Sequence, residues 1–175
     1  MIEELKTNLV PMIDGVPLCV YEGLLSVFCI ATALLLAFKG KKAWRGVARL
    51  LLVEYVFLIY CSTVLFRAAK ELREYNFTPF WSYSRPDLLI ENIMNVVVFV
   101  PVGFLLGFAT KEGKKGWLLA LLIGAGLSIG IETLQLAFKL GFAEVDDVMH
   151  NTLGCMIGYG VYSLVRIRHE KFYNL

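Results

Sequence analysis

The sequence predicts an all-α integral membrane protein with about five transmembrane helices. Of its 175 residues, 58% are hydrophobic and 18% are charged, whereas soluble domains average about 45–50% apolar and about 25% charged residues. Five helices of about 21 residues would use about 105 residues, close to the hydrophobic share of this chain. With a formal net charge of +2, the chain does not have the excess of basic residues that nucleic-acid-binding proteins show. The composition therefore excludes an ordinary soluble domain and predicts no nucleic-acid partner.

Five apolar stretches have the length and hydropathy of membrane spans. They lie at residues 18–38, 47–66, 88–108, 117–138 and 148–165. Eleven of the 17 basic residues flank the first and third connections or follow the last span, and six lie in the other segments. Because cytoplasmic segments are enriched in Lys and Arg, we expect the N-terminus outside and the C-terminus in the cytoplasm, in a multi-pass arrangement.

The third predicted helix contains Pro101. Proline lacks a backbone N–H and clashes with the preceding turn, so it kinks or breaks a helix. The carbonyl of Val97 would lose its helical partner. We therefore expect the third helix to be kinked, or partly re-entrant, at Pro101.

The segment 67–87 is an outer loop longer than most connections in compact folds. It begins with charged residues and ends with an aromatic stretch. Aromatic side chains beside spans favour the headgroup level, so one interpretation is an interfacial anchor. The other is a lid over a site formed by the spans, because long structured loops commonly carry function. The lid residues would be Phe77, Pro79, Phe80 and Trp81.

The last three predicted helices each carry two glycines four residues apart. In lipid, small residues at this spacing matter because they let helix backbones approach closely. We expect these helices to form a compact trio, and the first two spans to form a more loosely packed hairpin. The glycines are Gly103, Gly107, Gly126, Gly130, Gly154 and Gly158.

Several polar side chains lie inside or beside the last three predicted helices, near their outer ends. Polar groups within a membrane are costly and mark functional sites by default. The third and fifth helices enter from outside and the fourth ends there, so we expect these groups to meet in an outward-facing polar pocket. The predicted ligand-binding residues are Asn95, Glu132, Gln135, Asp146, Asp147 and Asn151, with Asn76 from the outer loop.

Each of these residues also has a structural interpretation. Asp146 and Asp147 suit the N-terminus of a helix, where the macrodipole stabilises carboxylates. Asn95 and Asn151 suit interhelical hydrogen bonds. Glu132 lies beyond the reach of capping, and the outer halves of the spans contain no Lys or Arg. A functional role is therefore favoured for Glu132.

The chain has four cysteines, none in a CxxC pair or near a His at metal-ligand spacing. Each lies in or beside an apolar stretch, where a free cysteine behaves as a small hydrophobic residue. Disulfide and zinc sites are both disfavoured. We expect no metal and no cofactor.

Four ordered motifs resemble the VanZ-like family of bacterial membrane proteins. They are Asn76-Phe-Thr-Pro-Phe80, Asn95-Val-Val-Val-Phe-Val-Pro-Val-Gly-Phe104, Ser128-Ile-Gly-Ile-Glu-Thr-Leu-Gln135, and Asp146-Asp-Val-Met-His-Asn-Thr-Leu-Gly154 followed by Gly158. The resemblance runs from about residue 76 to 160, and the first two spans match in hydropathy only. Members often carry an Arg a few residues before the paired aspartates, and residues 140–144 contain none here.

These observations divide the chain into three predicted parts. Residues 1–66 would form an N-terminal segment and a transmembrane hairpin. Residues 67–165 would form the VanZ-like core, made of the outer loop 67–87 and three glycine-packed helices. Residues 166–175 would form a basic cytoplasmic tail.

The resemblance implies a protein of the bacterial cell membrane, associated with resistance to teicoplanin-type glycopeptide antibiotics or with cell-surface homeostasis. Our leading hypothesis is that the outer pocket binds a lipid-linked cell-wall intermediate or a glycopeptide, with membrane lipid as the other partner. Two alternatives stay open. One is an intramembrane enzyme that acts on a polyprenyl or glycerolipid substrate with Glu132 or Asp147 as base. The other is a small transporter. It would have to work as an oligomer, because the chain has few spans and no internal repeat.

Overall fold

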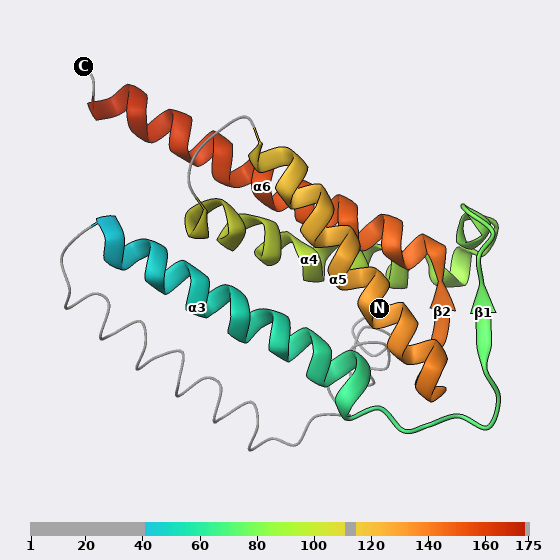
Figure 1. The fold of residues 1–175 in the computed structure, drawn as a ribbon. Coiled ribbons are helices and arrows are strands. Elements are labelled where there is room, and N and C mark those ends of the chain that lie inside the picture. The colour runs from blue at the N-terminus through green and yellow to red at the C-terminus, as the bar shows by residue number, and fades with distance from the viewer. Residues whose placement is uncertain (1–40, 111–114, 174–175) are drawn as a thin grey trace, which may run out of the picture.

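The computed structural model describes residues 41–110 and 115–173. The first predicted span, 18–38, lies outside these residues. The described chain is mostly helical, with four long helices along a common direction and a two-stranded sheet at one end of them (Figure 1). Helices α3 and α5 run toward the sheet, and α4 and α6 run away from it (Figure 1).

The elements follow one another along the chain with short connections, apart from the loop between α3 and α4. In order they are α3 (Lys41–Tyr60), a π-helical turn (Cys61–Leu65), β1 (Glu74–Asn76), two 3₁₀ turns (Trp81–Ser84 and Pro86–Leu88), α4 (Leu89–Ala109), α5 (Gly116–Phe138), β2 (Phe142–Glu144) and α6 (Val145–Tyr173). The buried apolar core lies between α4, α5 and α6 and includes Phe99, Val102, Leu106, Ala120, Ile131 and Tyr159.

Three of the described helices are long and apolar enough to cross a membrane. They cover Arg45–Leu65, Pro86–Ala109 and Gly116–Phe138, and they coincide with the second, third and fourth predicted spans. Helix α6 contains the fifth predicted span, 148–165, and is not among them. It carries His150 and Asn151 in its first turns, and both side chains are buried against the neighbouring helices. Packing therefore shields these polar side chains of α6. An average hydropathy over the helix still includes them and is lowered by them.

Helix α4 is a single helix from Leu89 to Ala109 and continues through Pro101. A helix of this length rises about 31 Å at 1.5 Å per residue. Close to the proline, the Tyr55 hydroxyl of α3 donates a hydrogen bond to the Val98 carbonyl at 3.0 Å. A partner from a neighbouring helix thus contacts the α4 backbone beside Val97, whose carbonyl has no N–H of Pro101 to accept from. The kink itself stays a prediction.

Glycines bring α4 and α6 into backbone contact. A Cβ atom at Gly103 would collide with the backbone of Cys155, and one at Gly154 or Gly158 would collide with the backbone of α4 at Val96 or Val100. Backbone atoms cannot move aside as a flexible side chain can, so this close parallel packing requires glycine at these positions. Gly107 faces the ring of Tyr162 on the same interface.

Helix α5 uses a different glycine against this pair. A Cβ atom at Gly124 would press on Cys155 and Thr152 of α6. A Cβ atom at Gly126 would meet no atom of the described residues within 4 Å, and one at Gly130 would meet the hydroxyl of Tyr60. The spacing Gly126–Gly130 therefore does not form the α5–α6 contact, because those two glycines lie on other faces of the helix.

The two-stranded sheet was not predicted. Strands β1 and β2 pair in parallel, with Glu74 opposite Phe142, Tyr75 opposite Ala143 and Asn76 opposite Glu144. Three residues are too few to show the alternation by which strands are predicted, and the two segments lie more than 60 residues apart. The all-α prediction is therefore correct for the helices and incomplete at this end of the molecule.

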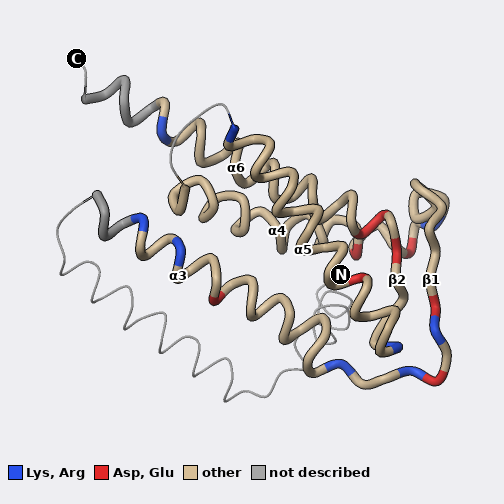
Figure 2. Tube along the Cα trace, in the orientation of Figure 1, with Lys and Arg blue, Asp and Glu red and all other residues tan. Residues whose placement is uncertain are grey.

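Charged residues gather at the two ends of the helices (Figure 2). At the end away from the sheet, Arg45 and Arg49 lie early in α3, Lys115 precedes α5 and Arg166 lies late in α6. Arg49 donates a hydrogen bond to the Ala109 carbonyl at 3.0 Å, where a cation complements the C-terminal end of α4. Among the described residues, most carboxylates lie at the sheet end, together with the basic residues of the loop after α3 (Figure 2).

Candidate functional site

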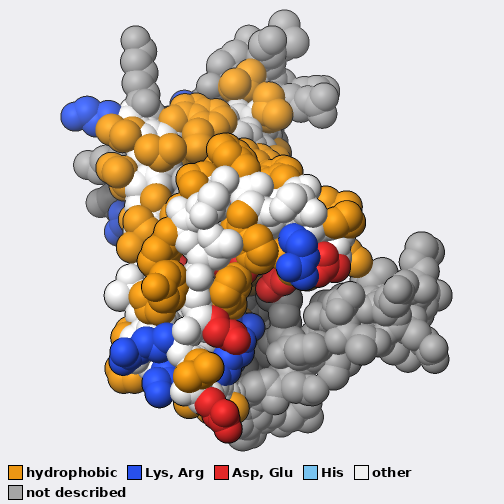
Figure 3. All heavy atoms as spheres, turned by 90° about the vertical axis from the view of Figure 1, so that its right-hand side faces the viewer, with side chains coloured by type: hydrophobic (Ala, Val, Ile, Leu, Met, Phe, Trp, Pro, Cys, Tyr) orange, Lys and Arg blue, Asp and Glu red, His pale blue; other side chains and the backbone are white. Residues whose placement is uncertain are grey.

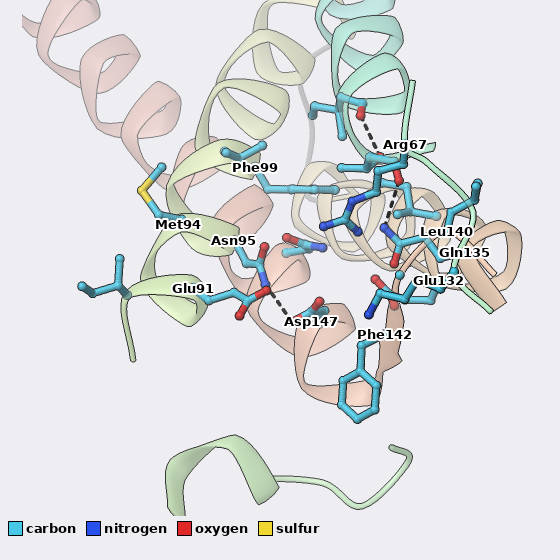
Figure 4. Close-up of a pocket in the computed structure, with 18 of the residues that line it drawn as sticks. Arg67, Glu91, Met94, Asn95, Phe99, Glu132, Gln135, Leu140, Phe142 and Asp147 are labelled. Carbon is cyan, nitrogen blue, oxygen red and sulfur yellow. Dashed lines mark hydrogen bonds between the residues drawn. The ribbon is translucent and has the colours of Figure 1, made fainter. Parts of the chain in front are cut away.

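A cavity of about 490 Å³ lies between the helices near the sheet end of the molecule (Figure 4). Its walls come from the end of α3, from α4, α5 and α6, and from the segments next to the two strands. Small-molecule sites commonly measure about 300–1,000 Å³, so the volume is that of a binding site. The polar lining residues are Thr63, Arg67, Lys70, Asp87, Glu91, Asn95, Glu132, Gln135, Asp147 and Asn151.

Five of the seven residues predicted to bind a ligand line this one cavity. They are Asn95, Glu132, Gln135, Asp147 and Asn151. Helix periodicity explains the grouping, because residues three or four apart share one face of a helix. The glycine contact between α4 and α6 then brings the faces of those two helices together. The other two predicted residues, Asn76 and Asp146, do not line the cavity.

Asn95 and Asp147 join α4 to α6 at the cavity wall. The Asn95 side-chain amide donates a hydrogen bond to Asp147 Oδ1 at 2.7 Å. Glu91 lies one turn before Asn95 and lines the same wall. Its side chain is exposed and makes no hydrogen bond or ion pair within the part of the chain that the structure describes. Figure 4 shows Glu91, Asn95 and Asp147 together on one side of the cavity.

Glu132 and Gln135 line the cavity and also hold neighbouring segments. Buried Glu132 accepts a hydrogen bond from the backbone N–H of Glu144 at 3.0 Å. The Gln135 side-chain amide donates one to the Thr63 carbonyl at 3.1 Å. The chain can return to Glu132 because Lys139 adopts a left-handed conformation, with φ at 60°, at the end of α5. These two residues therefore connect α5 to β2 and to the end of α3.

Asn151 has one partner and one free atom. Its side-chain amide donates a hydrogen bond to the Ser128 hydroxyl at 2.8 Å, and both residues are buried. Its Oδ1 atom has no hydrogen-bond partner among the described residues. A buried acceptor without a donor costs free energy, and a ligand that supplies an N–H or O–H group would remove that cost.

Arg67 is a cavity residue that the sequence analysis did not predict. It follows the π-helical turn after α3, and Figure 4 shows its guanidinium directed into the cavity near Gln135. A Cβ atom at Gly141 would meet Arg67 Nη1 and Gln135 Oε1. The sequence did show that Arg67 directly follows an apolar span. That position does not show whether its side chain points into a cavity. Arg67 thus places a cation beside the stretch 140–144, which lacks the Arg that family members often carry.

Asp146 does not line the cavity and instead anchors the loop. It is fully buried, and its carboxylate accepts hydrogen bonds from the backbone N–H of Phe80 at 2.6 Å, from that of Ser82 at 2.9 Å and from the Ser82 hydroxyl at 2.6 Å. Asn92 of α4 donates to the same hydroxyl at 3.1 Å. Phe80 has a left-handed backbone, with φ at 63°. We call Phe80, Ser82, Asn92 and Asp146 the loop anchor.

The four predicted lid residues do not line the cavity, and one of them, Phe80, belongs to the loop anchor. Phe77 and Phe80 are more than half exposed, as are Tyr75 and Tyr83 of the same loop. Figure 3 shows charged and hydrophobic side chains mixed on this face of the molecule.

Two local contacts shape the rest of this loop. Asn76 accepts a hydrogen bond from the Thr78 N–H at 2.9 Å, which forms a local turn. The Tyr83 hydroxyl lies 3.0 Å from His150 Nε2 at the start of α6, so the loop is tied to α6 by a second contact beyond the loop anchor.

Trp81 connects the loop to the cavity through β2. Its indole N–H donates a hydrogen bond to the Glu144 carboxylate at 3.0 Å, and its ring meets that of Phe142, a lining residue, edge to face. Burial raises the pKa of the Glu144 carboxyl to about 7, and this hydrogen bond opposes the rise. Glu144 therefore takes up a proton near neutral pH.

Two comparisons with known proteins identify relatives of this chain. The sequence profile of the VanZ/LLP1 family matches residues 46–166. The chain belongs to the VanZ/LLP1 family. It is 32% identical to Protein VanZ of Enterococcus faecium over 128 residues, which are 71% of this chain and 76% of that protein. No solved structure gives a significant match. Together with its three apolar helices, the family relationship makes the chain a membrane protein.

The match extends the resemblance of residues 76–160 to the second predicted span. In this VanZ/LLP1 protein, the residues of the family motifs divide between two tasks. Asn95, Glu132, Asp147 and Asn151 line the cavity, whereas Asp146 holds the outer loop. The motif glycines of α4 and α6 set the distance between those helices.

Proposed function

We propose that this protein is a VanZ-like cell-envelope protein of the bacterial membrane that binds a ligand in the polar cavity. The ligand would be a lipid-linked cell-wall intermediate or a glycopeptide. Because the chain belongs to the VanZ/LLP1 family, we expect its role to be resistance to teicoplanin-type antibiotics or homeostasis of the cell surface. The single observation that carries the proposal is the cavity of about 490 Å³ lined by Asn95, Glu132, Gln135, Asp147 and Asn151.

The depth of these groups supports a binding role. Glu132 and Gln135 lie in the last turns of the apolar helix α5, and Asn95 lies in the second turn of the apolar helix α4. A charged group in the hydrocarbon region costs at least about 2.5–3.5 kcal/mol on insertion scales for Asp. A ligand or water that forms hydrogen bonds with several such residues around one space would lower this cost.

The distribution of charge supports an outward-facing cavity. The end away from the sheet carries Arg45, Arg49, Lys115 and Arg166 (Figure 2), and cytoplasmic ends of spans are enriched in such residues. The cavity lies at the opposite end. This orientation agrees with the predicted five-span topology, with the N-terminus outside and the C-terminus in the cytoplasm.

The exposed aromatic side chains of the outer loop support the same orientation. Tyr75, Phe77, Phe80 and Tyr83 are each more than half exposed, and aromatic residues are enriched at the headgroup level of membranes. The loop anchor would hold them there, at the mouth of the cavity. The loop would then restrict which molecules reach the cavity from the outer leaflet.

The chemistry that this role needs is binding, without a nucleophile. Carboxylates accept hydrogen bonds from hydroxyl, amide and ammonium groups, and the amides of Asn and Gln both donate and accept. The lining offers these groups on a partly apolar wall that includes Met94, Phe99 and Leu140. Such a wall suits a ligand with a polar end and an apolar part.

Antibiotic susceptibility tests this function. Cells that express the wild type, Glu132→Gln or Asp147→Asn would be compared in teicoplanin, at equal abundance of the protein in the membrane. We expect each variant to lower resistance at least fourfold, because each replaces a carboxyl group of the cavity lining by an amide. Unchanged resistance in both variants would remove the cavity from the proposal. Glu71→Gln is the matched control, because this exposed loop carboxylate does not line the cavity.

A further inference from the structure

Two groups of polar residues lie on different walls of the cavity, and Glu132 interacts electrostatically with both Glu91 and Arg67. One region, on α4 and α6, contains Glu91, Asn95, Asp147 and Asn151. The other, at the end of α3 and beside Gly141, contains Arg67. Figure 4 shows Arg67 and Glu91 on different sides of the same space. We call these the acidic region and the basic region.

The acidic region offers hydrogen-bond acceptors that nothing in the described chain uses fully. Glu91 makes no hydrogen bond or ion pair with the described residues, and Asp147 accepts only the one from Asn95. Asn151 adds an independent observation, because it is 6% exposed and its Oδ1 has no hydrogen-bond partner within residues 41–110 and 115–173. Two carboxylates beside an unpaired amide oxygen form a site for a group with several N–H donors.

The basic region offers one cation, Arg67, which interacts electrostatically with Glu132 but makes no direct ion pair among the described residues. Two other charged lining residues are already paired, Lys70 with Glu74 at 2.5 Å and Asp87 with Arg85 at 2.8 Å. Arg67 has no ion pair among the residues that the structure describes, and its guanidinium can bind a phosphate or carboxylate through two N–H groups.

We infer that the ligand of this cavity is a zwitterion, with a primary ammonium group in the acidic region and a phosphate or carboxylate at Arg67. The inference rests on the proposed binding function and names the chemistry of the ligand. A primary ammonium has three donors, which suit Glu91, Asp147 and Asn151 Oδ1. An anion without the ammonium leaves those acceptors unpaired, and a cation without the anion leaves Arg67 unpaired.

Two sources can supply this chemistry, the headgroup of a membrane lipid and a small soluble zwitterion. Native mass spectrometry on the full chain in detergent separates them. The probes are short-chain phosphatidylethanolamine, phosphatidylglycerol of the same chain length and soluble O-phosphoethanolamine. Phosphatidylglycerol carries the same phosphate without the ammonium. We expect the wild type to bind phosphatidylethanolamine at least tenfold more tightly than phosphatidylglycerol.

Variants of the two regions should act differently. Asp147→Asn and Glu91→Gln each weaken the acidic region, so they should reduce the preference for phosphatidylethanolamine at least threefold without weakening phosphatidylglycerol. Arg67→Gln removes the cation and should weaken both lipids. Glu91 and Arg67 are exposed, so their variants keep the test valid even if Asp147→Asn unfolds. The matched controls are Glu71→Gln and Arg73→Gln, exposed loop changes outside the cavity, which should leave both affinities unchanged.

Competition by O-phosphoethanolamine against bound phosphatidylethanolamine would support headgroup recognition of a lipid. Binding of O-phosphoethanolamine alone would support a soluble zwitterion. Equal binding of the two lipids without binding of O-phosphoethanolamine would overturn the inference. So would a lipid preference unchanged in Glu91→Gln together with lipid affinities unchanged in Arg67→Gln.

Failure of the inference and failure of the proposed function are distinguishable. Lower resistance in Asp147→Asn together with equal binding of the two lipids would overturn the zwitterion and leave the cavity function. A zwitterion preference that Asp147→Asn abolishes, with resistance unchanged in both Asp147→Asn and Glu132→Gln, would support the zwitterion site and remove its link to resistance.

Discussion

Asp146 and Asp147 are adjacent in the chain and have opposite surroundings. Asp146 is fully buried and accepts three hydrogen bonds from the loop at Phe80 and Ser82. Asp147 lines the cavity and accepts one hydrogen bond, from Asn95 of α4. Neighbouring residues on a helix point about 100° apart, which is enough to send one carboxylate to the loop and the other to the cavity.

The comparison shows that one motif serves both the architecture and the site. The loop anchor, made of Phe80, Ser82, Asn92 and Asp146, is internally satisfied. The cavity contains acceptors without partners among the described residues, such as Asn151 Oδ1. We therefore expect changes in the loop anchor to alter stability, and changes at Asp147 to alter binding with little effect on stability.

The largest effect is expected for Asp146→Ala. The change leaves the backbone N–H groups of Phe80 and Ser82 and the Ser82 hydroxyl without their acceptor, which should lower the free energy of unfolding by about 3 kcal/mol. Asp147→Ala should lower the free energy of unfolding by less than about 1 kcal/mol, because only the hydrogen bond from Asn95 is lost. SDS-induced unfolding in mixed micelles measures both. Equal losses in the two variants would contradict the division between loop anchor and cavity.

Glycine substitutions extend the comparison to helix packing. Gly154→Ala places a methyl group against the backbone of Val96, so it should lower the free energy of unfolding by about 2 kcal/mol. Gly126→Ala meets no described atom within 4 Å, so it should be neutral or stabilising by up to about 1 kcal/mol. The same unfolding assay gives both values. A Gly126→Ala loss as large as that of Gly154→Ala would mean that α5 packs through Gly126 as well.

Ser82→Ala should have a smaller effect than Asp146→Ala. It removes the hydroxyl that donates to Asp146 and accepts from Asn92, but it keeps the Ser82 backbone N–H bond. We expect a loss of about 1 kcal/mol, seen as lower thermal stability in detergent. A loss equal to that of Asp146→Ala would show that the hydroxyl, and not the backbone N–H groups, carries the loop anchor.

The smallest effect is expected from pH. Because burial raises the pKa of Glu144 from 4.5 to about 7, the folded state binds more protons than the unfolded state between these values. Stability from this group is therefore complete below about pH 4.5 and is lost as the pH rises through about 7. Glu144→Gln should flatten the fall in thermal stability between pH 5 and pH 7 relative to wild type. Parallel pH profiles for the two proteins would contradict a shifted Glu144.

The helical part of the fold could be predicted because it depends on local composition. The spans 47–66, 88–108 and 117–138 coincide with described apolar helices, since a run of apolar residues must be helical to satisfy its backbone in lipid. The strand pair could not be predicted, because three residues of β1 find three residues of β2 across more than 60 residues of chain. Gly126 and Gly130 show the same limit, since equal spacing does not tell which face of a helix meets a neighbour.

The candidate site was predictable to a similar degree. Glu132, Gln135, Asp147 and Asn151 could be grouped because spacing of three or four residues places them on one face of their helices. Arg67 could not, because its side chain enters the cavity from a loop whose path is set by contacts with Gly141 and Gln135. The loop anchor could not be predicted either, because nothing in the sequence around Ser82 indicates that it bonds to Asp146.

By itself, the amino-acid sequence determined that this chain is a helical membrane protein with polar residues near one end of its last three helices, and which residues share a helix face. These properties follow from composition and from a period of 3.6 residues, which are local. The tertiary structure alone decided that Asp147 faces the cavity while Asp146 holds the loop, and that Arg67 faces the carboxylates. Those outcomes depend on the rotation of each helix and the path of the loop, which are set by close packing between residues distant in the chain.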